Sequence, residues 1–396
     1  MISAALIADK AQSLKGFCIE TRRDFHRNPE VGMQEERTAR LAAQHLEKLG
    51  LDIRTGVGGT GVSGVLQGAR PGRTIAIRAD MDALPIQDQK TCDYASRRAG
   101  VMHACGHDGH TAMLMATASL LTDLRDSLCG NVQFIFQPAE EGPGGARAMI
   151  DDGVLLDPKV DACLGLHLQT DLLVGRIGIR YGTISAASDS IEISIRGQAG
   201  PGAGPHEAVD AIAVAAQAIV ALQTIVSREI SPVEPAVVSV GTVRGGYRGN
   251  VIADEVFMTG TVRTLQADTR SMMPQRIERI IRGVTGAMRA SYDLKYSFGY
   301  PSALNDTAIT ALAESAAKEI LGQDQVEHLP APTMGAEDFA YFAEAVPASF
   351  LRLGARNEAK GIIYPGHNPK FDFDEDAMPT GVSVLSLAAI KYLLER

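Results

Sequence analysis

The sequence lacks features that would direct the protein to nucleic acid or to a membrane. It has no surplus of positive charge: 38 Lys and Arg stand against 47 Asp and Glu, a net charge of −9 with a pI near 5.5. It contains no uncharged apolar run of about 18 residues, the length that crosses a bilayer. The first ten residues reach Asp9 without a basic start and do not resemble a signal peptide. We therefore expect neither a nucleic-acid partner nor a membrane partner.

Cysteine is also scarce, and its five positions are odd in number and irregular in spacing. Such a set predicts no disulfide framework. Most of the cysteines are interpreted as free buried thiols in a reducing cytoplasm, namely Cys18, Cys92, Cys129 and Cys163. Only Cys105 stands among residues with metal-ligand chemistry.

The length of 396 residues and mass of 42.1 kDa predict about two domains. A first pattern alternates apolar strands with helices, and polar residues gather where the strands end. The expected helices are 3–49, interrupted at 27–30, and 110–124; the expected strands lie near 74–80, 131–137 and 161–168. This order predicts an α/β fold, a doubly wound sheet with its site at the carboxyl edge.

A second pattern begins after residue 184. Strands with period-two alternation are expected at 188–196, 236–244, 254–265 and 293–298, and helices at 205–228 and 268–290. The order strand-helix-strand-strand-helix-strand is that of a ferredoxin-like α+β domain. Helices at 306–321 and from about 380 restore the first pattern. We therefore predict a catalytic domain of residues 1–183 and 298–396 with a domain of residues 184–297 inserted into it.

Metal-ligand chemistry is concentrated at His103–Ala112, which holds three of the nine histidines and one cysteine. Cys105 and His107 stand two apart where a helix is expected to begin, and thiolate and imidazole are strong ligands for first-row metals. The alternative is a helix start rich in small residues with incidental histidines. Because Cys and His clusters are rare, we favour the metal site.

Glu140 and Glu141 follow the strand expected at 131–137. Adjacent carboxylates on an extended backbone point in different directions, so one is able to bind metal while the other serves as general base. A solvated acidic turn is the alternative, and the position directly after a buried strand argues against it.

Four further residues carry weaker signals. His167 ends an apolar strand, where a histidine is more often a hydrogen-bonded core residue, and His367 lies on a loop between prolines. Asp80 and Asp82 follow the first buried strand. They are candidates for carboxylates that orient ligand histidines, and ordinary loop acids remain an alternative.

Together these motifs resemble the metallopeptidase-like amidohydrolase family of aminoacylases, hippurate hydrolases and auxin-conjugate hydrolases. The resemblance runs from about Phe25 to the C-terminus and rests on R-A-D-M-D-A-L-P, H-A-C-G-H-D-G-H, F-Q-P-A-E-E-G, G-L-H-L, G-x-x-N-V-I, M-G-A-E-D-F-A and H-N-P-K-F-D-F-D-E. It implies Glu140 as general base and two divalent metal ions, held by Cys105, His107, Glu141, His167 and His367. It also implies a zinc-peptidase-like catalytic domain whose inserted lid forms a homodimer or homotetramer.

One position departs from the family's pattern. Pro201 stands where the lid of related enzymes carries a histidine that reaches a neighbouring subunit's active site, and proline offers no donor there. His206 is retained. Arg248 is either a substitute positive charge or a solvated loop residue, and both readings stay open.

The expected reaction is hydrolysis of the amide C–N bond in a small N-acyl amino acid or similar conjugate. Asn250 and Arg263 are candidates to hold the substrate carboxylate, and Mn, Zn, Ni or Co each suit the ligand set. Because Pro201 removes an oxyanion donor, one alternative is hydrolytic deamination of an activated aromatic amine, which disperses charge itself. A second alternative is a metal-bound binding protein without activity.

Overall fold

The computed structural model describes residues 2–394, and the chain divides into two compact units. Unit 1 contains the residues up to Ile184, Leu304–Ala331 and the residues from Asp338 onward. Unit 2 contains Ser185–Ala303 and Pro332–Glu337. The predicted inserted range of 184–297 therefore differs from unit 2 at its C-terminal end and in the short segment 332–337. The role of unit 2 as a lid stays a prediction.

Unit 1 is built on an eight-stranded mixed sheet with the order β1-β2-β4-β3-β5-β16-β6-β15. The central strands β4, β3, β5 and β16 are parallel to one another. The strand bounds are β1 Asp52–Val57, β2 Gly61–Gln67, β3 Arg70–Asp80, β4 Cys129–Gln137, β5 Ala162–Leu173, β6 Ile177–Ile179, β15 Val326–His328 and β16 Ala348–Arg356. Short strands β7 Gly182–Ser185 and β14 Ala303–Asn305 lie where the chain passes between the units.

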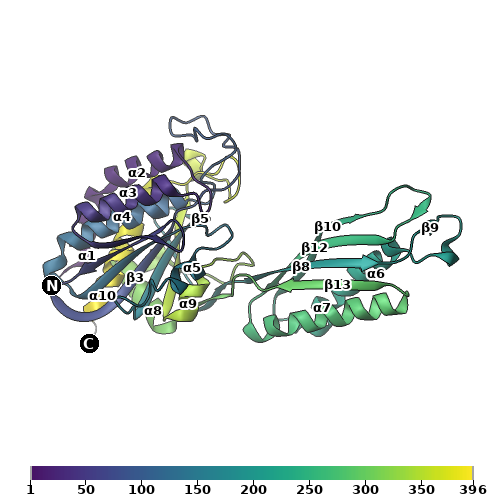
Figure 1. Cartoon of the computed structure of the whole chain (residues 1–396). Helices are drawn as coiled ribbons and strands as arrows, with labels where there is room; N and C mark the ends of the chain where they lie inside the picture. The colour runs from purple at the N-terminus through teal and green to yellow at the C-terminus, as the bar shows by residue number, and fades with distance from the viewer. Residues whose placement is uncertain (1, 395–396) are drawn as a thin grey trace. The chain divides into compact units, whose positions relative to one another are not determined.

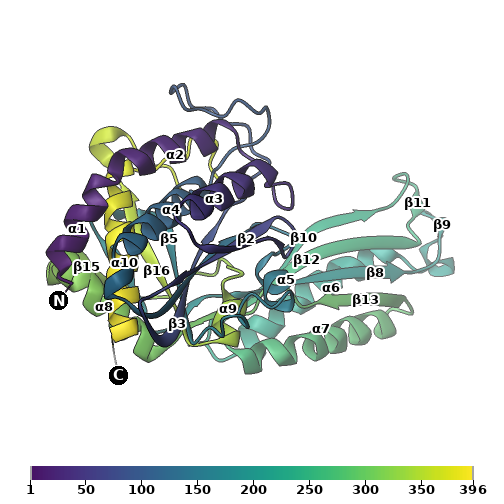
Figure 2. The ribbon, with the colours of Figure 1, turned by 60° about the vertical axis from the view of Figure 1, so that its left-hand side comes forward.

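The helices of unit 1 complete the predicted α/β architecture, which is confirmed. They are α1 Ala4–Ser13, α2 Lys15–Arg27, α3 Glu36–Lys48, α4 His107–Asp123, α5 Ala146–Asp151, α8 Thr307–Leu321, α9 Ala340–Ala345 and α10 Met378–Leu394. Figures 1 and 2 show α4 and α10 side by side against the sheet, where both contact β3. The expected helix at 3–49 has its predicted interruption after Arg27, where α2 ends, and a further break at Leu14 separates α1 from α2.

The alternation of side chains along β3 places apolar residues on one face of the strand and charged residues on the other. Ile75, Ile77 and Ala79 belong to the apolar core that α4 and α10 help to form. Because successive residues of a strand point to opposite faces, Arg78 and Asp80 leave this core and face the other way, although both are buried. The carboxyl end of β3 therefore presents charged groups inside the protein.

Unit 2 is a four-stranded antiparallel sheet with the order β10-β12-β8-β13. Its main elements are β8 Ala187–Arg196, α6 Ala211–Thr224, β10 Ala236–Gly245, β12 Glu255–Thr264, α7 Ala267–Ala287 and β13 Ser291–Ser297. Figure 2 shows α6 and α7 on one face of this sheet, where an apolar cluster joins them. This strand order is that of a ferredoxin-like sandwich, as the sequence predicts.

The helix expected at 205–228 is shorter than predicted. Residues Pro205–Glu207 form a separate 3-10 turn, and α6 begins only after Asp210, whose side chain accepts from the N–H groups of Ile212 and Ala213. The cap has a physical reason, because an Asp at this position satisfies donors that have no partner inside the helix. A π-helical turn, Ile225–Glu229, follows the end of α6.

Two helical segments are long and apolar enough to cross a membrane, judged by length and composition alone. They are Glu375–Leu394, whose apolar stretch is 83% buried within the protein, and Ala211–Glu229, whose apolar stretch is 33% buried. The first has the burial of a core helix. The second leaves an apolar surface on unit 2.

Candidate metal centre

The carboxyl ends of three parallel strands bring the predicted site residues of unit 1 together. β3 ends at Asp80, β4 ends at Gln137 just before Glu140, and β5 carries His167. The helix α4 begins at His107, three residues earlier than expected, after Gly106 adopts a φ of 89°. That left-handed conformation, which glycine adopts without strain, turns the chain sharply between Cys105 and His107.

Cys105, His107 and His167 form a first group of potential ligands, with donor atoms all within 4.8 Å of one another. The His107 Nδ1 lies 3.2 Å from the Asp82 carboxylate, and its Nε2 has no hydrogen-bond partner among the described residues. The Nδ1 of His167 donates to the Leu168 carbonyl at 2.6 Å, and its Nε2 lies 3.4 Å from the Cys105 sulfur. In both imidazoles the Nδ1 contact therefore leaves Nε2 for a metal ion, as orienting hydrogen bonds do in metal sites.

Cys105 also belongs to a second group, with Glu141 and His367, whose donor atoms meet the same distance limit. The His367 Nε2 lies 3.0 Å from Glu141 Oε1. Because the thiol is common to both groups, the five predicted ligands form two adjoining sets that share one sulfur. Two adjoining donor groups of this kind fit a site for two metal ions.

The donor chemistry fits metal ions. Burial raises the pKa of the Cys105 thiol to about 12, so the thiolate forms only where a cation compensates its charge, as a divalent metal does. His107 Nε2 is a buried nitrogen without a hydrogen-bond partner in the described chain. A buried polar atom of this kind is costly unless a ligand completes it.

His110, although it stands in the same cluster, is excluded as a ligand by its contacts. Its Nδ1 lies 2.6 Å from Asp80, and its Nε2 accepts the Leu168 N–H at 2.9 Å. Both ring nitrogens are thus in use. Burial alone would raise the pKa of Asp80, but His107, Arg78 and His110 hold that pKa well below its usual value. Asp80 therefore orients His110, whereas Asp82 orients His107.

Glu140 is only 7% exposed and so does not belong to a solvated turn. Its donor atoms form a group with those of His107 and Glu141, again within 4.8 Å. The two oxygens of Asp82 accept the backbone N–H groups of Glu140 and Glu141, each at 3.0 Å. One carboxylate therefore orients a candidate ligand and fixes the backbone of the candidate base.

Two residues of the site have a backbone conformation that is unfavourable for their type. Ala139, directly before Glu140, has a φ of 53°, and His367 has a φ of 64°. A buried carboxylate, Glu35, accepts the Ala139 N–H at 2.8 Å and holds that residue in place. Strain of this kind persists only where surrounding contacts over-determine it, which is common at functional sites.

Unit 2 holds the remaining predicted residues at two ends of its sheet. Arg263 on β12 pairs with Ser188, at the end where the chain enters the unit, and burial lowers its pKa. The other end carries Pro201, which forms strand β9 (Gly200–Pro201) opposite β11 (Val251–Ile252). Asn250, Arg248 and His206 lie exposed in the neighbouring loops, and the Asn250 carbonyl accepts the Gly202 N–H at 2.8 Å. The structure thus places Arg263 apart from the other three.

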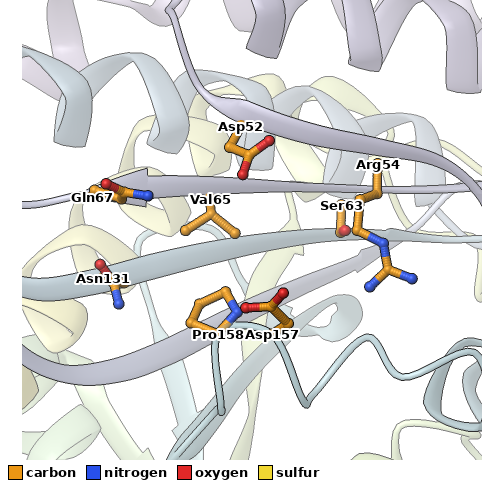
Figure 3. A pocket seen from close by; sticks show the side chains of 8 residues that line it. All are labelled: Asp52, Arg54, Ser63, Val65, Gln67, Asn131, Asp157 and Pro158. Atoms are coloured by element: carbon orange, nitrogen blue, oxygen red, sulfur yellow. The ribbon is translucent and has the colours of Figure 1, made fainter.

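A pocket of about 150 Å³ on β1, β2 and β4 has a different character. Figure 3 shows Asp157 and Pro158 facing side chains of these strands, among them Ser63 and Val65. None of the predicted ligands lines this pocket, and it contains neither Cys nor His. This pocket is therefore separate from the predicted ligands.

Several residues that support the site were not found by sequence reasoning. They are Glu35, Arg78, His110, Gln137 and Asp338, all buried or nearly so. One signal was present in the sequence: Arg78 interrupts an otherwise apolar strand, and a charged residue in a buried strand needs a partner. That partner, Asp338, lies 260 residues away along the sequence, so no local pattern indicates it.

Comparisons with known proteins define the class to which this fold and site belong. Residues 76–391 match Peptidase family M20/M25/M40. The chain is 41% identical over 374 residues to N-acetylcysteine deacetylase of Bacillus subtilis (strain 168), covering 94% of this chain and 95% of that protein. It is 47% identical over 288 residues to an N-acyl-L-amino acid amidohydrolase of Geobacillus stearothermophilus, covering 72% and 77% of the two chains.

A solved structure supports the same conclusion. A dinuclear metal-binding peptidase of the M20 family from Bacillus subtilis superimposes with a TM-score of 0.84 at 37% identity, over 96% of this chain and 99% of that one. The chain therefore belongs to Peptidase family M20/M25/M40, and it is a metal-binding hydrolase of amide bonds.

Proposed function

We propose that the protein hydrolyses the amide C–N bond of a small N-acyl amino acid or similar conjugate. The observation that carries this proposal is the pair of ligand groups sharing Cys105, with the buried carboxylate of Glu140 beside them. The relatives whose names describe deacetylation or deacylation of amino acids support the substrate class. The proposed ligands are those predicted: Cys105, His107, Glu141, His167 and His367.

Two divalent ions of Mn, Zn, Ni or Co, when bound to these ligands, supply Lewis acidity for the carbonyl and acidify the attacking water. Glu140 accepts a proton from that water as its oxygen bonds to the carbonyl carbon. The same carboxylic acid then donates the proton to the nitrogen, so that the C–N bond breaks and a neutral amine leaves. Asp82 supports this step because it holds both the Glu140 backbone and His107.

Substrate recognition is proposed for unit 2. Arg263 is partly buried, and no hydrogen bond or salt bridge engages its side chain within residues 2–394, so its guanidinium is available for a substrate carboxylate. Asn250, Arg248 and His206 are proposed as secondary contacts from the opposite end of the sheet. Pro201, which has no side-chain donor, keeps deamination of an activated aromatic amine as the second candidate reaction.

We also propose that unit 2 mediates a homodimer, or a homotetramer built from such dimers. β10 is an edge strand that pairs only with β12 in the described part of the chain, and unpaired edge strands offer backbone groups to a second copy. The neighbouring α6 exposes an apolar stripe that includes Ile212 and Val220, at 48% and 67% exposure. A cytoplasmic location is proposed as well, because all five cysteines are free.

Metal reconstitution tests the proposal. Elemental analysis should find about two divalent ions per chain, and a chelator should abolish activity that Mn, Zn, Ni or Co restores. A panel of hippurate, N-acetyl amino acids, dipeptides and aromatic amines should show turnover of the N-acyl amino acids first. Less than one equivalent of metal together with activity that survives chelation would contradict the proposal.

A further inference from the structure

A buried network of hydrogen-bonded polar residues lies next to the loop that carries Glu140, and the proposed mechanism does not use this network. Its centre is Arg78 on β3, which is 2% exposed. The guanidinium donates in three directions: Nε to Gln137 Oε1 at 2.7 Å, Nη1 to Asp80 Oδ2 at 2.7 Å and Nη2 to Asp338 Oδ1 at 2.8 Å. Because every arm of this planar group is engaged, its orientation is fixed.

Asp338 connects this network to the loop that carries Glu140. Its fully buried carboxylate accepts from the Gln137 amide at 2.8 Å and from the backbone N–H groups of Gly145 and Ala146 at 3.1 and 3.0 Å. Those two residues close the loop that begins after Gln137. The backbone N–H of Asp338 itself donates to Glu140 Oε1 at 3.3 Å. Asp338 therefore contacts both the end of the loop and the candidate base.

The other arm of Arg78 leads toward the proposed ligands. Asp80, which accepts from Arg78, also accepts from His110, and His110 in turn accepts the N–H of Leu168, the residue after His167. The network thus runs without interruption from the Glu140 carboxylate to the strand end that holds His167, a proposed ligand.

Stability alone is a poor explanation for this arrangement. The hydration energy that a buried ion pair loses is about as large as the Coulomb attraction that it gains. Apolar replacements of similar volume are therefore often neutral or stabilising. Orientation is a better explanation, because a misplacement of about 1 Å is able to cost about 10²-fold in rate. Groups that must hold such geometry are locked by the hydrogen bonds around them.

We propose that Asp338, anchored by Arg78, is a positioning residue that holds the Glu140 carboxylate in the orientation needed for proton transfer. The inference rests on the proposed function, in which Glu140 is the general base. It concerns the placement of that carboxylate and leaves the ligand set unchanged.

Asp338→Asn is the direct test. The Arg78, Gln137, Gly145 and Ala146 groups that contact the carboxylate are all donors, so the amide NH2 of Asn would face a donor and at least one hydrogen bond would be lost. We expect kcat to fall roughly 10- to 100-fold while KM and the metal content per chain stay at wild-type values. Arg78→Lys keeps the charge but not the three-way geometry, and it should shift kcat in the same direction.

Asp374→Asn is the matched control. Asp374 is another buried carboxylate of unit 1, and its partners Asn357, Lys360 and the N–H of Asp376 lie outside the Glu140 loop. A merely structural role would make the Asp338 and Asp374 variants alike in stability and in kcat. We expect them to be alike in stability and different in kcat. If Asp338→Asn does not fold, Arg78→Lys carries the comparison.

Three results overturn the inference. The first is wild-type kcat in folded, metal-loaded Asp338→Asn and Arg78→Lys. The second is a loss of metal in Asp338→Asn, which would make Asp338 a support of the ligands. The third is an equal fall of kcat in Asp374→Asn. The Glu140→Gln variant distinguishes a failure of this inference from a failure of the proposed function. If Glu140→Gln keeps turnover, the general-base assignment itself is wrong. If Glu140→Gln is inactive while the Asp338 variants are active, only the positioning role is wrong.

Discussion

The two units of the protein bury polar groups in different ways. Unit 1 encloses many charged side chains, and the Arg, Asp and Glu residues that are at most 2% exposed are Arg22, Glu35, Arg78, Asp80, Asp82, Asp108, Asp338 and Asp374. Between residues 187 and 297 of unit 2, all of which the structure describes, Asp189 is the one buried carboxylate. The rest of the core in this range is mainly an apolar cluster of the kind that any two-layer α+β domain requires, and the separate segment 332–337 of unit 2 adds the buried Glu337.

This difference indicates that buried charge serves chemistry in unit 1 and stability in unit 2. Burying charge is costly, so it is expected where precise chemistry requires it. In unit 1 one group of these charges, Arg78, Asp80 and Asp338, is joined by hydrogen bonds at the carboxyl end of β3. In unit 2 the buried Asp189 binds Arg270 and the Tyr296 hydroxyl, and none of the proposed ligands belongs to that unit. Substitutions that separate activity from stability should therefore behave differently in the two units.

The largest expected effect is that of Glu140→Gln in unit 1. Removing the proton acceptor should lower kcat by about 10²–10⁴-fold, while folding and metal content stay unchanged. The measurement is steady-state kinetics with elemental analysis of the same sample. Glu141→Gln is the matched variant and should lose metal affinity instead. If both variants keep metal and only the second loses turnover, the two roles are reversed.

In unit 2 we expect a large effect on stability and little on the metal centre. Asp189→Ala leaves the Arg270 guanidinium without its bidentate partner and should lower the free energy of unfolding by about 3 kcal/mol. Chemical denaturation measures this, with metal content as the second readout. The control is Asp293→Ala, which breaks an exposed pair with Arg196 and should change stability very little. A metal content that falls with Asp189→Ala would refute the separation.

Pro201→His tests whether unit 2 also contributes to catalysis. An imidazole at this position would offer a donor to a developing oxyanion, so turnover of simple N-acyl amino acids should rise roughly tenfold, below the ~10²–10³ of an optimised donor. An aromatic amine substrate should gain nothing, because it disperses the charge itself. The measurement is kcat/KM on both substrate types. Fast wild-type turnover of N-acyl amino acids, unaffected by Arg248→Ala, would show that a donor at this position is not needed.

The smallest expected effect is a pH dependence of stability far from the metal centre in unit 1. Burial alone would raise the pKa of Glu314, but hydrogen bonds from Lys318, Tyr181 and His328 lower it from 4.5 to about 2. Because the folded pKa lies below the unfolded one, the contribution is complete above pH 4.5 and is lost as the pH falls toward 2. Glu314→Gln should remove about 1 kcal/mol at pH 7 and flatten this dependence. Denaturation curves between these pH values provide the measurement, and an unchanged slope would contradict it.

Some parts of the fold were predictable because their signals are local. The alternating strands and the Ala-rich helix of unit 2 follow from period-two and helical patterns, and their order alone indicated a ferredoxin-like sandwich. β16 was missed, although it is a central strand of unit 1. Its partner β5 lies far away along the chain, and a short apolar run that is buried on both sides has no period to distinguish it.

The candidate site shows the same division between local and distant information. Cys105 and His107 are two residues apart, and Glu140 and Glu141 are adjacent, so the sequence by itself determined which residue types meet where a strand ends. Only the tertiary structure decided that His110 is not a ligand, because both of its ring nitrogens are engaged by Asp80 and Leu168. It also decided that Asp338 reaches Glu140, since that contact joins residues 198 positions apart. Residue chemistry and local periodicity are properties of the sequence, whereas hydrogen-bond partners depend on distances that exist only after the chain has folded.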